Sequence, residues 1–412
     1  MANQHSTVKL VFRSLGSRNY LLFFIGQGLS LIGTWCQITA MSWLIYRLTN
    51  SAFLLGATGF TSQFPAFLIA PFAGVIADRM SRKNILLITQ ILYMIQSFTL
   101  AMLVIYNRIT IWHLILLSLV AGIINGFDMT VRHSFVNDLV ENKEHLGNAI
   151  ALNSSLFNMA RLVGPTIAGL IIGAAGEGIC FLINSISFIA IIIALLFMKI
   201  NGEEKKKTEF FQGMKEGFIG AFNSVPIKMA LFLTALVSLM GMSYGVLMPV
   251  FAKDIFHGGP HTLGFLMSAS GLGALMGALT IASKETNRGF ERLIPAGACI
   301  CGLGLTGAAF SSNLYLSMVL IFLTGYGMIV FFTSSNTLIQ TTVEKDMCGR
   351  VMSLYTMSFS GTMPLGSILA GSLAQNIGAR YTILIGGVFC ICGALLFAGR
   401  VKPRKEQFVY QE

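Results

Sequence analysis

The sequence predicts an all-α membrane protein with twelve transmembrane helices arranged as two six-helix bundles. Hydrophobic residues make up 54% of the chain and charged residues only 11%, whereas a soluble globular protein carries roughly 25% charged residues. Apolar segments of about 20 residues, the length that crosses a bilayer as a helix, recur twelve times along the chain. The basic residues fall on alternate loops between these segments, which is typical of a multi-pass membrane protein.

Each predicted span ends where polar or charged residues interrupt the apolar run. In chain order, the approximate spans are 20–46, 52–77, 85–105, 111–131, 147–173, 179–198, 229–251, 263–283, 293–310, 314–338, 349–374 and 381–399. With both termini in the cytoplasm, 23 of the 28 Lys and Arg residues fall on cytoplasmic segments, four fall on outer loops, and Arg161 lies inside a span. One span more or fewer would destroy this asymmetry, so the charge distribution supports the count of twelve.

Composition and motifs argue against nucleic-acid binding, against disulfide or metal sites, and against a cleaved signal peptide. The net charge of +11 is scattered through short loops, which membrane topology explains better than nucleic-acid binding. Six of the seven cysteines lie in predicted spans, where thiols pack as small apolar groups, so neither a disulfide framework nor a metal site is expected. The polar segment Met1–Asn19 precedes a first apolar run of full span length, so this span, and no cleaved signal peptide, is expected to direct insertion.

A repeat of glycines divides the chain near its middle. Gly147, Gly164 and Gly169 in span five recur at an offset of 202 as three glycines in span eleven: Gly349, Gly366 and Gly371. The division predicted from this repeat is an N-terminal bundle over 1–198, a cytoplasmic linker with an amphipathic helix over 199–228, and a C-terminal bundle over 229–412. The two bundles are expected to be parallel repeats of one design.

Two charged residues lie inside predicted spans, where each costs at least about 2.5 kcal/mol at the centre of a helix. Asp128 in span four precedes Arg132 by one turn, so the two can pair; a structural ion pair and a proton site are both open. Arg161 lies about 21 Å from the cytoplasmic end of span five, at about 1.5 Å per residue. It requires an anionic or carbonyl partner, and we expect it to attract an anionic or polar substrate or to pair with Asp128, with a purely structural role as the alternative.

Polar side chains at helical spacing mark the faces that are predicted to line a substrate cavity. In span one they recur every three or four residues, as expected for one face of a helix. For any single Ser, Thr or Asn, hydrogen bonding between helices is the favoured alternative. Together with one aromatic residue of span seven, the predicted cavity residues are Gln27, Thr34, Gln37, Asn125, Asn158 and Tyr244.

The turn between spans two and three reads Gly-Val-Ile-Ala-Asp-Arg-Met-Ser-Arg-Lys from Gly74 to Lys83 and resembles the loop signature of the major facilitator superfamily. The resemblance implies that a small-molecule substrate binds between two bundles, which rock to expose it alternately to each side of the membrane. It also implies a cytoplasmic latch that fastens the outward-facing state, between this turn, a basic residue of helix four and the Gly349–Arg350 end of helix eleven. The expected latch residues are Gly74, whose missing side chain allows close helix contact, Asp78, Arg79, Arg82 and Arg132.

Span five carries a second resemblance. The stretch Arg-Leu-Val-Gly-Pro-Thr-Ile-Ala-Gly from Arg161 to Gly169 is similar to the helix-five signature of antiporter-type exporters of that superfamily, with Ala168 where the signature has glycine. Gly164, Pro165 and Gly169 are its expected hinge, because proline frees a backbone carbonyl and bends the helix. The stretch Trp-Leu-Ile-Tyr-Arg-Leu-Thr from Trp43 to Thr49 resembles the bacterial branch that includes the enterobactin exporter and macrolide efflux carriers.

These resemblances imply a secondary active transporter of a bacterial inner membrane that exports a small siderophore-like or drug-like molecule, driven by proton antiport. A solute importer and a lysophospholipid flippase of the same fold are the alternatives. No intramembrane enzyme is expected, because no H-E-x-x-H or Ser/His/Asp arrangement occurs, and no nucleotide-binding loop indicates an ATP-driven pump. Besides protons and membrane lipids, no cofactor, nucleic acid or second subunit is expected.

Overall fold

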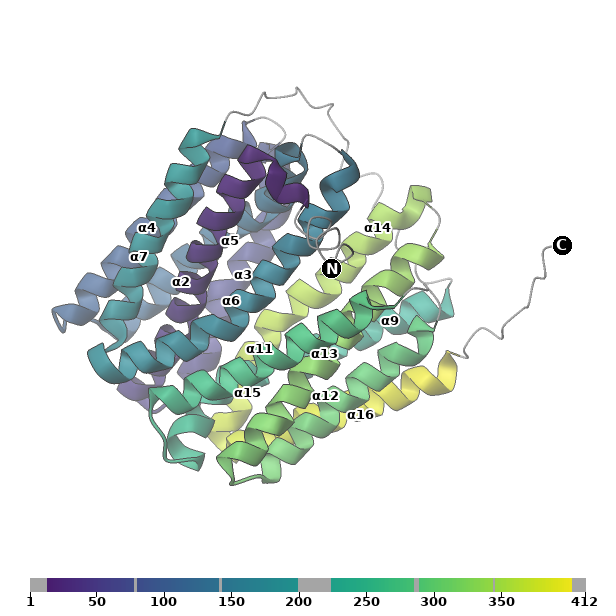
Figure 1. The fold of residues 1–412 in the computed structure, drawn as a ribbon. Helices are drawn as coiled ribbons and strands as arrows, with labels where there is room; N and C mark the ends of the chain where they lie inside the picture. Colours follow the sequence, from purple (N-terminus) through teal and green to yellow (C-terminus); the bar gives the residue numbers. More distant parts are fainter. Residues whose placement is uncertain are drawn as a thin grey trace, which may run out of the picture.

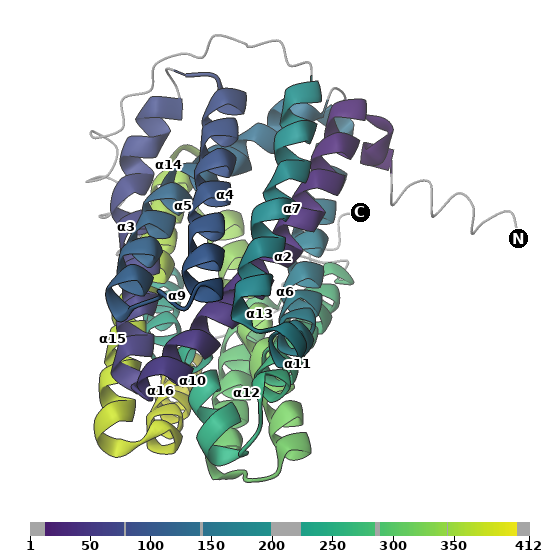
Figure 2. The same ribbon diagram turned by 90° about the vertical axis from the view of Figure 1, so that its left-hand side faces the viewer.

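The computed structural model describes residues 13–77, 80–140, 143–198, 224–284, 289–343 and 345–401. Asp78, Arg79 and the linker residues 199–223, with the amphipathic helix predicted there, lie outside the described residues. The predicted fold class is confirmed, since long helices form two bundles that lie side by side in Figure 1, one in purple to teal and one in green to yellow. The view turned by 90° in Figure 2 shows the same two sets of helices.

The N-terminal bundle contains six long helices and two short 3₁₀ segments. The short segments, η1 (Arg13–Gly16) and η2 (Lys143–His145), precede the first and fifth long helices. The long helices are α2 (Arg18–Thr49), α3 (Ala52–Ala77), α4 (Arg82–Ile105), α5 (Ile111–Leu139), α6 (Leu146–Ala175) and α7 (Glu177–Phe197).

The C-terminal bundle contains four unbroken segments and two spans that π-helical turns interrupt. The seventh span consists of α9 (Val225–Leu236), η3 (Val237–Gly241), α10 (Tyr244–Val250) and η4 (Phe251–Ile255). The eleventh consists of α14 (Lys345–Thr356), η5 (Met357–Gly361) and α15 (Thr362–Ile377). The unbroken helices are α11 (Pro260–Ala282), α12 (Phe290–Phe310), α13 (Leu314–Thr342) and α16 (Ala379–Arg400).

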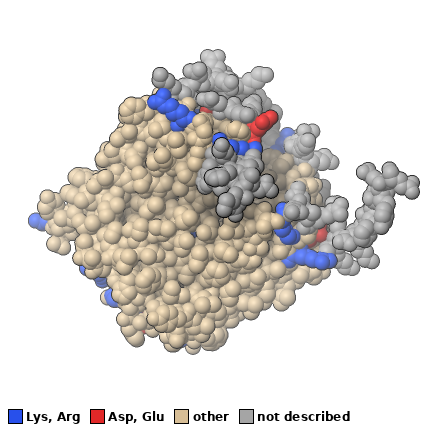
Figure 3. All heavy atoms as spheres, viewed as in Figure 1, with Lys and Arg blue, Asp and Glu red and all other residues tan. Residues whose placement is uncertain are grey.

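Helix lengths and surface chemistry agree with a membrane-spanning chain. Among the described residues, eleven helices are long and apolar enough to cross a bilayer; the interrupted eleventh span completes the predicted twelve. Several helices extend beyond their predicted limits because polar residues continue the helix outside the apolar run, as α5 does from Arg132 to Leu139. In Figure 3 the visible charged atoms lie near the helix ends and a broad uncharged surface lies between them, as contact with lipid requires.

The glycine repeat of the sequence corresponds to equivalent contacts in the two bundles. A Cβ atom at Gly164 would lie 2.5 Å from the Trp35 side chain of the first span, and one at Gly366 would lie 2.2 Å from a backbone oxygen of the seventh span. Five residues further on, Gly169 contacts α11 of the other bundle, and Gly371 contacts α3 in the same way. The first span thus corresponds to the seventh and the fifth to the eleventh, which is the pattern of a parallel repeat.

The same offset of 202 also relates two turns. Gly176 follows α6 with φ 83° and Gly378 follows α15 with φ 89°. This left-handed region strains any residue that carries a Cβ atom, so glycine is needed to reverse the chain at once into α7 and α16. The two bundles therefore both reverse the chain at equivalent positions with a glycine of positive φ.

For clarity, the end of the molecule that carries Arg13 and Val401 is called the inner end, and the end that carries Asn50 and Asp254 is called the outer end. The apolar core is continuous across both bundles in one cluster that includes Tyr46, Leu55, Leu247 and Leu266. Toward the inner end the core divides into a cluster of the N-terminal bundle and a separate cluster of the C-terminal bundle. The two bundles are therefore joined in the outer half of the molecule and packed independently in the inner half.

Close helix contacts inside the C-terminal bundle predict a large loss of stability on substitution. A Cβ atom at Gly327 of α13 would lie 2.5 Å from backbone atoms of Cys301 and Gly297 in α12. Because neither backbone can move aside freely, we expect Gly327→Val to lower stability by about 3 kcal/mol or more. The control is Gly173→Val in α6, where a Cβ atom meets nothing within 4 Å. Equal fractions of folded protein after heating both variants in detergent would contradict the packing described here.

Candidate functional site

The two bundles touch along two helix pairs, which we call the outer seam: α6 with α11, and α3 with α15. Glycines make the first pair close, since a Cβ atom at Gly169 would lie 2.8 Å from the Pro260 oxygen and one at Gly264 would lie 2.5 Å from the Pro165 oxygen. In the second pair, a Cβ atom at Gly56 would lie 2.9 Å from Gly371 Cα. Small residues at these positions let the two backbones approach, as is typical of helix contacts in membranes.

Hydrogen bonds reinforce the outer seam at its outermost point. The Tyr46 hydroxyl donates to the Asp254 carboxylate across the bundle boundary, and the Lys253 ammonium donates to the Asn50 side-chain oxygen at 2.6 Å. The same ammonium lies 5.5 Å from the centre of the Tyr46 ring. We call Tyr46, Asn50, Lys253 and Asp254 the outer gate; a cavity of about 420 Å³ lies beside it.

The α6–α11 contact ends at Arg161, near the middle of the membrane span. A Cβ atom at Gly271 of α11 would lie 2.8 Å from the Arg161 backbone oxygen, and Ser268 donates to the backbone oxygen of Leu162 at 2.7 Å. Among the described residues, the hydrogen bonds between the bundles lie at this level or nearer the outer end. The described residues of the two bundles therefore separate on the inner side of Arg161.

Arg161 itself contacts aromatic groups of both bundles. Its guanidinium lies 5.7 Å from the centre of the Trp35 ring and near the Tyr244 hydroxyl. The Tyr244 hydroxyl also shares a hydrogen bond of 2.5 Å with Ser270. The expected alternative of an Arg161–Asp128 pair is wrong, because the Asp128 carboxylate is bound elsewhere.

Asp128 is buried in the inner half of the N-terminal bundle, in a group of five side chains that we call the Asp128 cluster. The carboxylate accepts hydrogen bonds from Thr89 at 2.9 Å, from Gln90 at 2.6 Å and from two nitrogens of Arg132 at 2.9 and 2.6 Å. Arg132 also donates to the Gln27 side-chain oxygen. The carboxylate is thus bound by charge-assisted hydrogen bonds that connect α4 and α5.

Three of the expected latch residues, Gly74, Arg82 and Arg132, are described by the structure, and both arginines form ion pairs within the N-terminal bundle. Arg82 pairs with Asp138 of α5 at 2.7 Å, and Arg132 pairs with Asp128, so both are engaged inside the N-terminal bundle. The expectation that Gly74 allows a close helix contact is wrong here, since a Cβ atom at Gly74 would meet nothing within 4 Å. The latch itself stays a prediction, because Asp78 and Arg79 lie outside the described residues.

The predicted cavity residues fall into different environments. Gln37 is bound inside the N-terminal bundle, where it donates to Gln96 at 3.1 Å and accepts from Ser97 at 2.6 Å and from Asn184 at 2.9 Å. This network is a structural connection among α2, α4 and α7, so the placement of Gln37 differs from the expected one. Gln27 belongs to the Asp128 cluster, whereas three other predicted cavity residues are partly exposed: Thr34, Asn125 and Asn158.

The expected hinge in the fifth span and the observed irregularities lie in different helices. α6 continues through Pro165 without a break, and its two glycines serve the contacts with Trp35 and α11. The π-helical turns η3, η4 and η5 lie instead in the seventh and eleventh spans, and Ser238 of η3 donates to the Phe359 oxygen of η5 at 2.7 Å. Such turns are frequent at functional sites. The glycines and serines around them are the feature of the sequence that could have indicated these turns.

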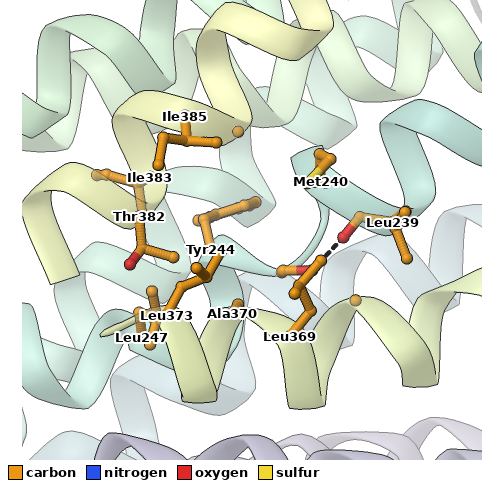
Figure 4. A pocket seen from close by; sticks show the side chains of 13 residues that line it. Leu239, Met240, Tyr244, Leu247, Leu369, Ala370, Leu373, Thr382, Ile383 and Ile385 are labelled. Carbon is orange, nitrogen blue, oxygen red and sulfur yellow. Dashed lines mark hydrogen bonds between the residues drawn. The ribbon is translucent and has the colours of Figure 1, made fainter. Parts of the chain in front are cut away.

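A narrow crevice within the C-terminal bundle borders Tyr244 but is almost wholly apolar. Figure 4 shows side chains of η3, α10, α15 and α16 around it, including Leu239, Leu369 and Ile383. The hydrogen bond drawn there joins the Ser243 hydroxyl to the Leu239 oxygen of the same span. This crevice is a packing feature beside Tyr244.

Comparison with known proteins agrees with the fold and the two-bundle geometry. A family model described as a transmembrane secretion effector, from the major facilitator superfamily, matches residues 12–408. The chain belongs to this family. It is therefore a multi-pass membrane transporter of the bacterial major facilitator superfamily and not an enzyme.

Two curated relatives and one solved structure illustrate this membership. The staphyloferrin A transporter of Staphylococcus aureus is 25% identical over 379 residues, which cover 91% of this chain and 94% of the relative. Macrolide efflux protein A of Streptococcus pyogenes is 22% identical over 383 residues, covering 92% and 94%. A bacterial homologue of the iron transporter ferroportin, solved in an inward-facing state, superposes with a TM-score of 0.72 at 17% identity and covers 92% of this chain and 98% of that one.

Proposed function

We propose that this major facilitator transporter exports a small amphipathic molecule, siderophore-like or drug-like, from the bacterial cytoplasm across the inner membrane. The observation that carries the proposal is the asymmetry of the inter-bundle contacts, which close the outer end and leave the inner half separated. This is the arrangement in which a carrier collects its substrate from the side of the termini. The relatives named for siderophore transport and macrolide efflux support export as the direction.

Topology and assembly belong to the same proposal. We propose that the termini and the linker lie in the cytoplasm, because the basic residues gather on these segments, and that the inner end therefore faces the cytoplasm. One chain supplies both bundles and both sides of the outer seam. We therefore propose that the monomer is the transporting unit, with membrane lipids covering its apolar sides.

Proton antiport is the proposed energy source, with Asp128 as the proton-binding residue. Arg132 neutralises Asp128 in the conformation with a closed outer end. When the loaded carrier turns outward, Arg132 leaves Asp128 for the turn that carries Asp78, and the carboxylate takes up a proton from the outer side. On the return to the inward-facing conformation, Arg132 pairs with Asp128 again and displaces this proton into the cytoplasm. The exchange of partners by one arginine thus couples proton binding to the movement of the bundles.

The proposal predicts that everted membrane vesicles accumulate a transported compound when respiration acidifies their interior, and lose it when a protonophore collapses the gradient. A panel of siderophores and lipophilic antibiotics tested with vesicles that lack the protein identifies the transported members. Uptake that is confined to right-side-out vesicles would establish an importer instead. Movement of lysophospholipid between leaflets, without transport of any panel member, would establish a flippase.

A further inference from the structure

Arg161 is a partly exposed cation that no carboxylate among the described residues neutralises. It lies well inside the apolar layer, where an unpaired charge costs at least about 2.5 kcal/mol. The three ion pairs among the described residues join other side chains, and the contacts of Arg161 are with Trp35 and Tyr244, both uncharged. A guanidinium maintained at this depth without a carboxylate indicates that a negative charge from outside the chain completes the site.

A ligand bound to Arg161 would contact both bundles. The outer seam closes beside Arg161 through Gly271, and the Tyr244 hydroxyl of the C-terminal bundle, which is hydrogen-bonded to Ser270, lies near the guanidinium. Arg161 and Trp35 are both partly exposed, in contrast to Tyr244, which is only 6% exposed. Arg161 and Trp35 therefore remain partly accessible at the edge of the outer seam, beside the buried Tyr244.

Aromatic surface lies next to the charge. The Trp35 and Phe157 rings meet edge to face with centroids 5.8 Å apart, and the Phe157 side chain is 47% exposed. An aromatic group can stack on such a surface while its acid group forms paired hydrogen bonds to the guanidinium, which is the geometry that arginine presents to carboxylates. The site thus joins an anion-binding group to a flat apolar surface.

We propose that Arg161 binds the carboxylate of an aryl carboxylate substrate, whose ring lies against Trp35 and Phe157. The inference rests on the proposed transport function and narrows its substrate class to amphipathic acids.

The test uses the purified full-length protein in a neutral maltoside detergent and the fluorescent acid dansylglycine, with dansylglycinamide as its uncharged counterpart. We expect the wild type to bind the acid about 10- to 100-fold more tightly than the amide, since a charge-assisted bidentate contact is lost. Arg161→Gln is expected to remove this preference and Arg161→Lys to retain part of it. The matched control is Arg108→Gln on an exposed outer loop, which should leave both affinities unchanged.

Several results would overturn the inference. These are failure of the wild type to bind dansylglycine, equal affinities for acid and amide, or an unchanged preference in Arg161→Gln. If Arg161→Gln does not fold, Trp35→Ala provides the second variant, and an unchanged affinity for dansylglycine in that variant contradicts the aromatic part of the site. Binding in detergent is independent of transport direction and driving force, so a failure here is distinguishable from a failure of the export proposal in vesicles.

Discussion

Asp128→Asn is expected to abolish proton-driven transport and to destabilise the protein at the same time. The substitution leaves the Arg132 guanidinium in a buried position without its carboxylate, and breaking such a pair costs about 3–5 kcal/mol. It also removes the group that we propose to bind the proton. Reconstituted protein with an imposed pH gradient should show at least a tenfold lower transport rate, and the fraction that stays folded after heating in detergent should fall.

Two further variants separate the proton-binding role of Asp128 from its structural role. In Asp128→Asn combined with Arg132→Gln, no buried charge remains unpaired, so much of the lost stability should return while proton-driven transport stays absent. Glu177→Gln is the control, because Glu177 also pairs with an arginine, Arg47, whose side chain is 48% exposed. Proton-driven transport at the wild-type rate by a stable double variant would show that Asp128 is not the proton-binding residue.

Tyr46→Phe is expected to shift the protein toward the conformation with an open outer end. The change removes the hydroxyl that donates to Asp254 across the bundle boundary and keeps the ring under the Lys253 ammonium. A hydrogen bond to a charged group contributes about 1.5–3 kcal/mol, which corresponds to a population change of about tenfold or more. Without this hydrogen bond, the outer gate would stabilise the conformation with a closed outer end less strongly.

The shift can be measured by the labelling rate of a cysteine at Leu55, which is 3% exposed in the outer half, with a membrane-impermeant maleimide. In a background without the native cysteines, Tyr46→Phe should accelerate this labelling about tenfold. Ser312→Ala is the control, because Ser312 accepts a hydrogen bond from Arg380 within the C-terminal bundle alone. Equal labelling rates in wild type and Tyr46→Phe would show that the outer gate does not hold this end closed.

The fold was predictable from the sequence because its determinants are local or periodic. Twelve apolar runs and alternating loop charges define the spans. The offset of 202 between Gly164 and Gly366 predicted the equivalent contacts that these glycines make in the two bundles. The interrupted seventh and eleventh spans were not predicted. A π-helical turn adds one residue to a helical turn and leaves the hydropathy pattern almost unchanged, so no periodic signal marks it.

The candidate site was predictable only in part. A polar stripe on the first span identified Gln27 and Gln37, but helical spacing does not say which neighbouring helix each side chain meets. In the structure one joins the Asp128 cluster and the other joins the network with Asn184. The cost of a buried charge singled out Arg161, whereas its contacts with Trp35 and Tyr244 depend on how three spans from two bundles come together.

The central claim is that the two bundles rock, opening one end as they close the other. Electron–electron distance measurements between spin labels test it most directly, with one pair at Met80 and Thr342 on the inner end and a second at Tyr106 and Tyr315 on the outer end, all exposed positions. From wild type to Tyr46→Phe, the account predicts a shorter inner distance together with a longer outer distance. Distances that stay the same at both ends, or that lengthen at both, would contradict it.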